Sequence, residues 1–424
     1  ELDNALESVL KSLSLREEVD IKVDTAFTHQ LVGTVYTAKG ELDQALEHFK
    51  ESETIGEEYN HVFLSALSSY SIGGNYLSKG ELDQALTYYQ KTLAIKETLP
   101  FGLTQNTLNN LGIIFINKGE LDQGLEYYKR SLAINEASGN QRSIAINLGN
   151  IGEAYIAKDD LKSAAECFNR ALDIYRNLNN DWGVAEVLYN LVQYFVDDLS
   201  SDTTSSYLDE FKEINTRRKD VPIISQKFRL TKAIVLKSSE RLTDKMTALS
   251  IFQEIADEEV VWYELTVAAM LNLGKLLILE LKTTGNEKVL TDVKKIADQL
   301  QDIAEKQNSY WLLVETYLLQ SKLALMELNV EQALQLLNQT EQLANEKKLS
   351  QLIKTISIER DLLTTQLTKW EEIIDKKPSV SERIQLTQLN TLLERMLHRE
   401  QYHNEKEIMK YAEEARQLVE AWEK

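Results

Sequence analysis

The chain has 424 residues, of which 43% are hydrophobic, and contains only 3 prolines and 16 glycines, a composition that fits an ordered, helical protein and excludes a disordered one. Acidic side chains outnumber basic ones by 67 to 47, and the formal net charge of −20 disfavours binding to nucleic acid or anionic lipid. The single cysteine, Cys167, excludes an internal disulfide and fits a reducing compartment. No apolar run approaches the roughly 20 residues of a membrane span, so we expect a cytoplasmic protein.

A short segment repeats along the N-terminal part of the chain. Gly-Glu-Leu-Asp-Gln-Ala-Leu starts at Gly40 and again at Gly80, and it returns with one change at Gly119. A copy without the glycine opens the chain at Glu1, and a decayed copy starts at Asp159. Successive copies are 40, 40, 39 and 40 residues apart. This fixed period predicts a solenoid, in which each unit buries its apolar face against its neighbours, and we expect the chain to start in mid-repeat.

Each of these repeats predicts two amphipathic helices joined by the glycine turn. In the third copy, apolar residues recur at three- and four-residue intervals over 108–115 before the turn and over 121–134 after it. Glycine at the turn is expected to end the first helix, because it enters the left-handed conformation at little cost. Carboxylates follow in the first turn of the next helix, where they suit the helix dipole.

The repeats resemble the tetratricopeptide repeat (TPR) family, whose pattern combines small and aromatic positions. One copy has Leu148, Gly152, Tyr155, Ala164 and Phe168 at these positions, although the closing proline of the family is absent from every copy. The resemblance implies an all-α, right-handed superhelical solenoid of antiparallel helix pairs, in which small residues let the paired helices approach. The period near 40 is similar to the long-period branch of the family, which includes kinesin light chains, Pins/LGN-type adaptors and bacterial Rap-type peptide receptors.

The motif fades in the C-terminal half of the chain. Segments that begin at Tyr263 and Tyr310 still align at an offset of 47 residues, which indicates helical repeats with looser spacing. Pro378 then marks a break, after which two final helices, roughly 379–397 and 404–423, are expected to cover the open end of the stack. The predicted segments are a regular TPR array over 1–196, an irregular transition over 197–222, degenerate TPR-like repeats over 223–377 and C-terminal capping helices over 378–424.

No catalytic or metal-binding pattern is present in the sequence. There is no glycine-rich phosphate loop, no cysteine pair and no His-Glu-x-x-His motif. The five histidines are scattered, and the two closest, His398 and His403, are five residues apart and fall on different faces of a helix. We therefore predict that the protein is not an enzyme and has no cofactor and no metal site.

Asparagine recurs at one position of the first helices. Asn110, Asn150 and Asn190 are 40 residues apart, and the TPR resemblance implies that this helix lines the concave groove. An amide offers a donor and an acceptor together, as an extended peptide backbone requires. Alternatively, the asparagines bond neighbouring helices and fix the angle between repeats. Further candidate groove residues on the same helices are Asn106, Asn109, Asn147, Glu153, Tyr189 and Gln193.

Lysine takes the following groove position in the C-terminal half. Lys275 and Lys322 occupy it, and Lys232 does so under a looser alignment. A line of lysines within an acidic chain suits an acidic peptide. The alternative is that these lysines are simply solvated.

Together these observations predict a non-catalytic adaptor or scaffold that binds a peptide or helical segment of a partner protein on its concave groove, with nucleic acid and membrane excluded as partners. The alternative function is a ligand- or peptide-sensing regulatory module of a signalling or transcription-regulator system, because the looser C-terminal half resembles the helical-repeat sensor segments of such regulators. An enzyme would need a constellation that these patterns do not contain. The identity of the partner and the oligomeric state stay open at this point.

Overall fold

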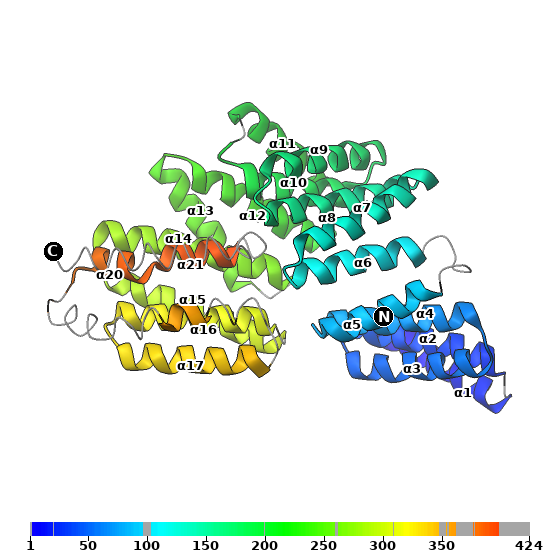
Figure 1. Cartoon of the computed structure of the whole chain (residues 1–424). Helices are drawn as coiled ribbons and strands as arrows, with labels where there is room; N and C mark the ends of the chain where they lie inside the picture. The colour runs from blue at the N-terminus through cyan, green and yellow to red at the C-terminus, as the bar shows by residue number, and fades with distance from the viewer. Residues whose placement is uncertain are drawn as a thin grey trace. The chain divides into compact units, whose positions relative to one another are not determined.

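A computed structural model describes residues 2–19, 21–95, 103–198, 200–258, 262–307, 309–346, 353, 356–361, 376 and 378–397. All regular secondary structure in these ranges is helical (Figure 1), and none of these helices is long and apolar enough to cross a bilayer. The chain divides into two compact units, Glu1–Ala154 and Tyr155–Lys424. The predicted helix over 404–423, His398 and His403 lie outside the described residues.

The first unit is a row of antiparallel helix pairs. Its helices are α1 (Leu2–Glu18), α2 (Lys22–Lys39), α3 (Leu42–Glu58), α4 (Val62–Ser78), α5 (Leu82–Ala94), α6 (Leu103–Asn117), α7 (Leu121–Ser138) and α8 (Gln141–Ala157), the last of which ends just beyond the unit. We call α2, α4, α6 and α8 the inner helices and α3, α5 and α7 the outer helices. Among the described residues, α2 packs against α4 and α4 against α6, whereas no contact of similar extent joins α3, α5 and α7. Neighbouring helix pairs of the row therefore contact each other through their inner helices.

Glycine ends the inner helices as the sequence predicts. Gly40, Gly80 and Gly119 have φ angles of 78°, 74° and 77°, in the left-handed region that glycine reaches without strain. At the first of these turns, the backbone N–H of Gly40 donates to the carbonyl of Thr37 at 3.0 Å. In the decayed fourth copy, Asp159 replaces the glycine and still adopts a φ of 60°. The turn geometry therefore persists where the glycine does not.

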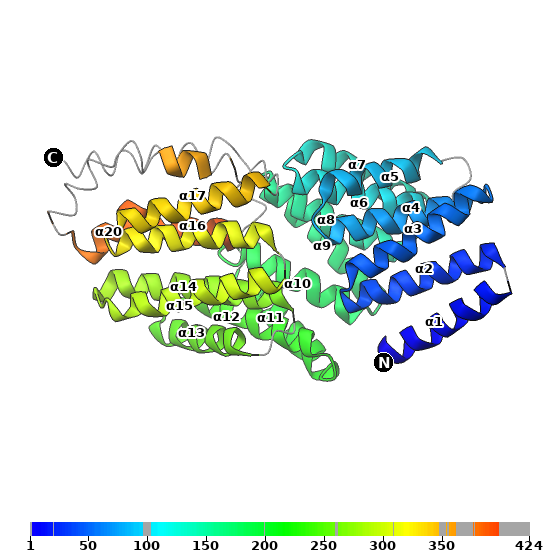
Figure 2. The ribbon, with the colours of Figure 1, turned by 90° about the horizontal axis from the view of Figure 1, so that it is seen from below.

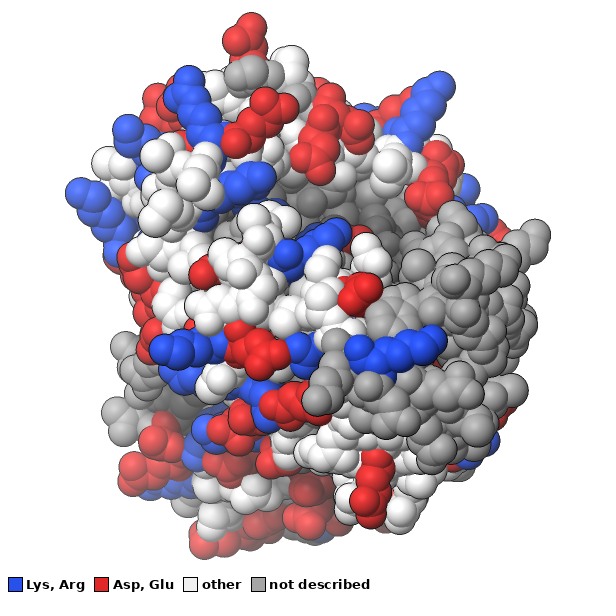
Figure 3. Space-filling view, turned by 90° about the vertical axis from the view of Figure 1, so that its left-hand side faces the viewer, with Lys and Arg blue, Asp and Glu red and all other residues white. Residues whose placement is uncertain are grey.

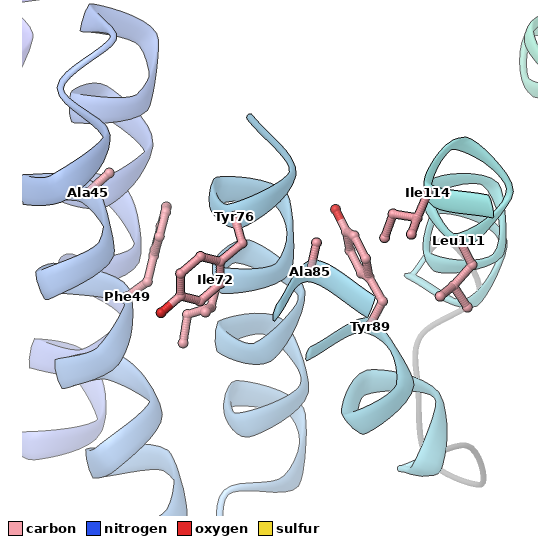
Figure 4. Packing of buried hydrophobic residues seen from close by; sticks show 8 residues of the cluster. All are labelled: Ala45, Phe49, Ile72, Tyr76, Ala85, Tyr89, Leu111 and Ile114. Carbon is pink, nitrogen blue, oxygen red and sulfur yellow. The ribbon is translucent and has the colours of Figure 1, made fainter. Parts of the chain in front are cut away.

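Aromatic rings of the outer helices pack against glycines of the inner helices, which confirms the predicted close approach. A Cβ atom built on Gly33 would lie 2.5 Å from the ring of Phe49, and one built on Gly112 would lie 2.4 Å from the ring of Tyr128. No side chain larger than hydrogen fits at these positions without movement of the ring. Figure 4 shows the same layer of buried residues passing from α3 to α6: Ala45, Phe49, Ile72, Tyr76, Ala85, Tyr89, Leu111 and Ile114.

The second unit continues with helix pairs of less regular length. Its described helices are α9 (Leu161–Asn177), α10 (Asp181–Phe195), α11 (Ser201–Arg217), α12 (Pro222–Ser238), α13 (Leu242–Asp257), α14 (Tyr263–Thr284), α15 (Lys288–Lys306), α16 (Tyr310–Met326), α17 (Val330–Glu346), α20 (Val380–Thr387) and α21 (Leu389–Leu397). Its inner helices are α10, α12, α14 and α16, and α10 packs against α12 as α12 does against α14. Figure 2 shows α14 with α15 and α16 with α17 as two successive pairs.

The structure differs from the expected irregular transition over 197–222. This stretch contains the 17-residue helix α11. Its run of serines and threonines begins the helix, because the hydroxyl of Ser200 accepts a hydrogen bond from the backbone N–H of Thr203 at 3.2 Å. Phe211 and Ile214 are buried on its apolar side. The polar run is therefore an N-cap, and the repeat pattern continues through it.

The described part of the expected C-terminal cap also differs in position. Helices α20 and α21 both pack against α14 and α16, and Figure 1 shows α21 running beside α14. They therefore lie along the inner side of the second unit, whereas the sequence led us to expect them over its open end. Helix α21 therefore packs on two helices rather than on one terminal helix.

Candidate functional site

The inner helices of the first unit are joined by side-chain hydrogen bonds at the recurring asparagine position. We call these three bonds the polar ladder. They run from Ser71 Oγ to Gln30 Oε1 (2.9 Å), from Asn110 Nδ2 to Tyr70 Oη (3.3 Å) and from Asn150 Nδ2 to Asn109 Oδ1 (2.8 Å). The two residues of each bond are 40 or 41 positions apart in the chain. Each repeat therefore presents one polar group to the repeat before it.

Asn110 also contacts α5, the outer helix that joins α4 to α6 in the chain. Its Nδ2 donates to the hydroxyl oxygen of Tyr89 on α5 at 2.8 Å. Burial raises the pKa of both Tyr70 and Tyr89, so these hydroxyls keep their protons at neutral pH. Asn110 thus links α4, α5 and α6 through its amide nitrogen.

Asn147 and Asn109 form a second polar cluster between α6, α7 and α8. Asn147 is only 2% exposed, and its Nδ2 donates to Asn109 Oδ1 at 3.0 Å and to Ser131 Oγ at 3.2 Å. Its Oδ1 accepts from Asn135 Nδ2 at 2.6 Å. Every polar atom of the Asn147 side chain is therefore satisfied inside the protein, which is what a buried amide requires.

Other side chains of the same helices face solvent. Asn106 is exposed, and Leu31 and Ile146 are 58% and 45% exposed despite being apolar. Leu31 holds the asparagine position in α2, while Asn106 and Ile146 lie one helical turn before that position in α6 and α8. Glu153 is half-buried one turn after it. Leu31 and Ile146 are absent from the sequence-based candidates, although Ile146 lies 40 residues after the candidate Asn106 and this spacing was a usable signal.

The candidates on α10 in the second unit are more enclosed. Tyr189 and Asn190 are buried, and burial raises the pKa of the Tyr189 hydroxyl. Gln193 is half-buried, and its side-chain oxygen is buried without a hydrogen-bond donor in the described part of the chain. The candidates on α10 are therefore less accessible to solvent than those on α6.

Lys227 on α12 covers this part of α10. Its ammonium forms an ion pair with Glu186, 41 residues earlier, so the repeat offset of the polar ladder recurs here as a charged pair. The ammonium also lies 5.7 Å from the ring centroids of Trp182 and Tyr189, within the range of cation–π attraction. Sequence reasoning missed this pair, although its 41-residue offset was a usable signal.

The predicted lysine line divides into one exposed and two paired side chains. Lys232 is exposed on α12. Lys275 pairs with Glu394 of α21 at 2.9 Å, and Lys322 pairs with Glu359 at 2.9 Å. Burial opposes ionisation of Glu359. The attraction of the positive charges of Lys322 and Arg395 outweighs this effect and holds the pKa of the Glu359 carboxyl below its usual value. The chain's own carboxylates thus occupy the two lysines that were expected to receive an acidic peptide.

A buried ion pair missed by the sequence reasoning lies beside these lysines. Arg395 of α21 contacts Glu315 of α16 through two hydrogen bonds, Nε to Oε1 at 3.2 Å and Nη2 to Oε2 at 2.6 Å. Glu315 is 2% exposed. The available signal was its place in α16, where Glu315 and Lys322 are the only charged residues among 17.

Histidine and acidic side chains form no metal centre in the described ranges, where no three His, Cys, Asp or Glu residues converge on one point. The closest histidine pair there is His29 and His48, whose Nδ1 atoms are 2.8 Å apart between α2 and α3. Tyr36 stacks on the ring of His48. This cluster joins an inner helix to its outer partner.

Residues 103–177, which form α6 to α9, match the sequence pattern of the tetratricopeptide repeat family. This segment carries tetratricopeptide repeats. The predicted TPR resemblance is thereby confirmed, and so is the predicted all-α stack of antiparallel helix pairs. Among proteins of curated function, none matches the sequence.

A search of solved structures finds several TPR-type proteins that match parts of this chain. The apo form of RapI has a TM-score of 0.52 and 16% sequence identity, with 66% of this chain and 99% of RapI covered. A Rap protein complexed with competence and sporulation factor has a TM-score of 0.46 and 15% identity, covering 84% and 99% of the two chains. MamA has a TM-score of 0.33 and 20% identity, covering 42% and 91%. At 16% identity the likeness to RapI concerns the fold alone.

Proposed function

We propose that this TPR protein is a non-catalytic scaffold that binds a peptide or a helical segment of a partner protein along the inner helices of its first unit. The observation that supports this most directly is the polar ladder, with Leu31, Asn106 and Ile146 exposed beside it. A row of helices fixed by hydrogen bonds that still exposes apolar and amide side chains is suited to contact with another protein.

The ladder leaves hydrogen-bonding capacity for a partner. Asn110 and Asn150 use their amide nitrogens in the ladder, and among the described residues neither side-chain oxygen accepts a hydrogen bond. Each oxygen is an acceptor for a backbone N–H of an extended peptide. Because the amides are already held in place, binding would not have to order them, which lowers the entropic cost of association. The two interpretations of the asparagines are thus compatible.

The test places a photo-crosslinking amino acid at position 106 and, as a control, at Leu242, which is 72% exposed on α13. In lysate of the source organism we expect a discrete crosslinked product from position 106 and none from position 242. The double variant Leu31→Glu and Ile146→Glu should remove this product while leaving the helical circular dichroism unchanged. Equal crosslinking from both positions, or a product that survives the double variant, would refute this binding face.

Exposed residues are the better targets because Asn110→Ala would change more than binding. That substitution removes a ladder bond and takes away the donor to the buried Tyr89 hydroxyl. An unsatisfied buried polar group costs about 1–3 kcal/mol. A loss of partner capture in Asn110→Ala would therefore combine a binding effect with a stability effect.

A further inference from the structure

Exposed apolar side chains concentrate at one end of the first unit. In the described ranges, 14 large apolar side chains are well exposed to solvent, and seven of them lie within residues 15–63. Five of these seven are in or beside the α1–α2 and α3–α4 turns, with exposed fractions between 37% and 66%: Val19, Ile21, Tyr59, Val62 and Phe63. We call these five residues the turn surface. Such a concentration of exposed apolar side chains is typical of an interaction site.

The two turns lie at the same end of the first unit, because each of them precedes an inner helix. Helices α2 and α4 pack against each other and run in the same direction, since one antiparallel outer helix separates them in the chain. Near the start of α2, the ring centroid of Phe27 lies 6.2 Å from that of Phe63 and 5.8 Å from that of His61, both at the start of α4. Phe27, which is half-buried, therefore links the two turns.

The backbone of the α3–α4 turn does not require apolar side chains. This turn and the α7–α8 turn each contain one residue in the left-handed region, Asn60 with a φ of 50° and Gly139 with a φ of 69°. At this offset of 79 residues, the α7–α8 turn has polar side chains where the α3–α4 turn has Tyr59, Val62 and Phe63, namely Ser138, Gln141 and Arg142. The exposed apolar side chains are therefore not needed to form the turn.

Carboxylates lie next to the turn surface at both turns. Glu17 and Glu18 end α1, and Glu57 and Glu58 end α3 at an offset of 40 residues; all four side chains are exposed. Negative charge at the C-terminal end of a helix interacts unfavourably with the helix dipole. Lys91 pairs with Glu57 at 2.7 Å, which offsets this cost at one of the four positions. A local arrangement that costs stability at both turns is typical of a functional surface.

The negative charge of the chain is concentrated in the same region. Residues 1–60 contain 14 acidic and 5 basic side chains, so the first 60 of 424 residues hold 9 of the 20 net negative charges. On the face shown in Figure 3, by contrast, side chains of both signs are interspersed among the coloured residues. An apolar surface bordered by carboxylates complements a segment that carries apolar side chains together with lysine or arginine. It repels anionic lipid and nucleic acid.

We propose that the turn surface binds a basic amphipathic segment of a partner protein. Apolar side chains of that segment pack on Tyr59, Val62 and Phe63, and its lysines or arginines pair with carboxylates such as Glu18 and Glu58. This goes beyond the proposed function, because the turn surface lies at the ends of the helices and does not include Leu31, Asn106 or Ile146. It adds a second partner site to the first unit.

The test uses the full chain and a fluorescein-labelled model peptide with leucine and lysine at amphipathic helical spacing. Fluorescence anisotropy should show binding to wild type, and a counterpart peptide with glutamate in place of lysine should bind at least tenfold more weakly. No binding of the lysine peptide, or equal binding of both peptides, would overturn the assigned partner chemistry.

A neutral variant tests the apolar part of the surface. Tyr59→Ser, Val62→Gln, Phe63→Gln places polar side chains where the α7–α8 turn also has them, and it should weaken binding of the lysine peptide at least tenfold. The matched control is Leu242→Ser, Met246→Gln, which removes two apolar side chains of α13 that are 72% and 64% exposed. We expect less than a twofold change in the control. Equal losses in the two variants, or no loss in the first, would overturn the proposal.

A second variant tests the carboxylates and decides the matter if the first loses helical content. Glu18→Gln, Glu58→Gln should weaken binding of the lysine peptide at least threefold and raise the melting temperature, because it removes negative charge from two helix C-termini. The matched control is Glu126→Gln, Glu166→Gln, which removes two exposed carboxylates, also 40 residues apart, from α7 and α9. Unchanged affinity in the first variant, or an equal loss in the control, would overturn the proposal.

Size-exclusion chromatography with light scattering tests the other possible occupant. A wild-type dimer that dissociates in Tyr59→Ser, Val62→Gln, Phe63→Gln would show that a second copy covers the turn surface, which would overturn the assignment to a partner segment. The proposed function is tested separately, by crosslinking from position 106. Failure of the peptide assay with retained crosslinking would remove only the turn surface, and peptide binding without crosslinking would remove only the proposed function.

Discussion

Two inner-helix glycines should respond in opposite directions to the same substitution. Gly112 lies in α6 against the ring of Tyr128, and a Cβ atom there would be 2.4 Å from two ring carbons. Gly149 lies in α8, and nothing stands within 4 Å of a Cβ atom at that position. Gly112→Ala therefore overpacks the repeat, whereas Gly149→Ala adds only a methyl group to an open surface.

The magnitudes follow from two opposing effects. Replacing glycine by alanine inside a helix stabilises it by about 1 kcal/mol, and this gain applies to both positions. Overpacking a filled core costs about 1–3 kcal/mol, and we take the upper end for Gly112 because Tyr128 is buried. We expect Gly112→Ala to destabilise by about 2 kcal/mol and Gly149→Ala to stabilise by up to about 1 kcal/mol.

The assay is urea unfolding followed by circular dichroism, together with hydrogen exchange of α6 and α7, because repeat arrays need not unfold in one step. A Tyr128→Leu background should absorb most of the cost of Gly112→Ala, which would give a coupling energy of about 1–2 kcal/mol between the two positions. Destabilisation of the same size by Gly149→Ala, or no coupling with Tyr128→Leu, would refute ring contact as the reason for glycine.

Three further changes test electrostatics and capping. Burial and the neighbouring charge of Lys275 lower the pKa of Lys237 to about 8, so between pH 8 and pH 10 the unfolded state binds more protons than the folded state. Over this range the free energy of unfolding of wild type should therefore rise by about 2 kcal/mol relative to that of Lys237→Met. Parallel pH profiles of the two proteins would contradict this. Burial also lowers the pKa of His29 and His48, so below pH 6.5 the unfolded state takes up protons before the folded state does, and stability should fall as the pH drops. The urea midpoint should therefore decrease between pH 7 and pH 5, and it should decrease less in His48→Gln than in wild type. An equal loss in both proteins would speak against the histidine pair. Asn180 caps the start of α10, because its side-chain oxygen accepts a hydrogen bond from the backbone N–H of Gly183 at 3.0 Å. Asn180→Ala should therefore lower the free energy of unfolding by about 1 kcal/mol and lower the melting temperature. An unchanged melting temperature would exclude the capping role.

The regular part of the fold could be predicted because its determinants are local and repeat. The turn at Gly40 and the fit of Gly112 against Tyr128 each depend on residues within one helix pair. The recurrence of asparagine was visible as well. Its hydrogen-bond partners were not, because they depend on which residue the previous repeat happens to offer, such as Tyr70 for Asn110.

The C-terminal part resisted prediction for two physical reasons. The serine and threonine run after Ser200 has the composition of a turn, and only the buried Phe211 and Ile214 further along show that it begins a helix. The position of α21 is set by contacts such as that of Arg395 with Glu315, 80 residues away. No period relates those two positions, so the sequence pattern carries no information about their meeting.

The polar ladder bears on how such a chain changes in length over evolution. Each rung joins two copies of the repeat, and its members (hydroxyls and carboxamides) can both donate and accept hydrogen bonds. Deleting or duplicating one whole copy by recombination would therefore bring a new but compatible pair together. Inserting a few residues within a helix would instead rotate one member away from the other. The ladder thus permits growth and shrinkage of the array in steps of one repeat, and it penalises other steps.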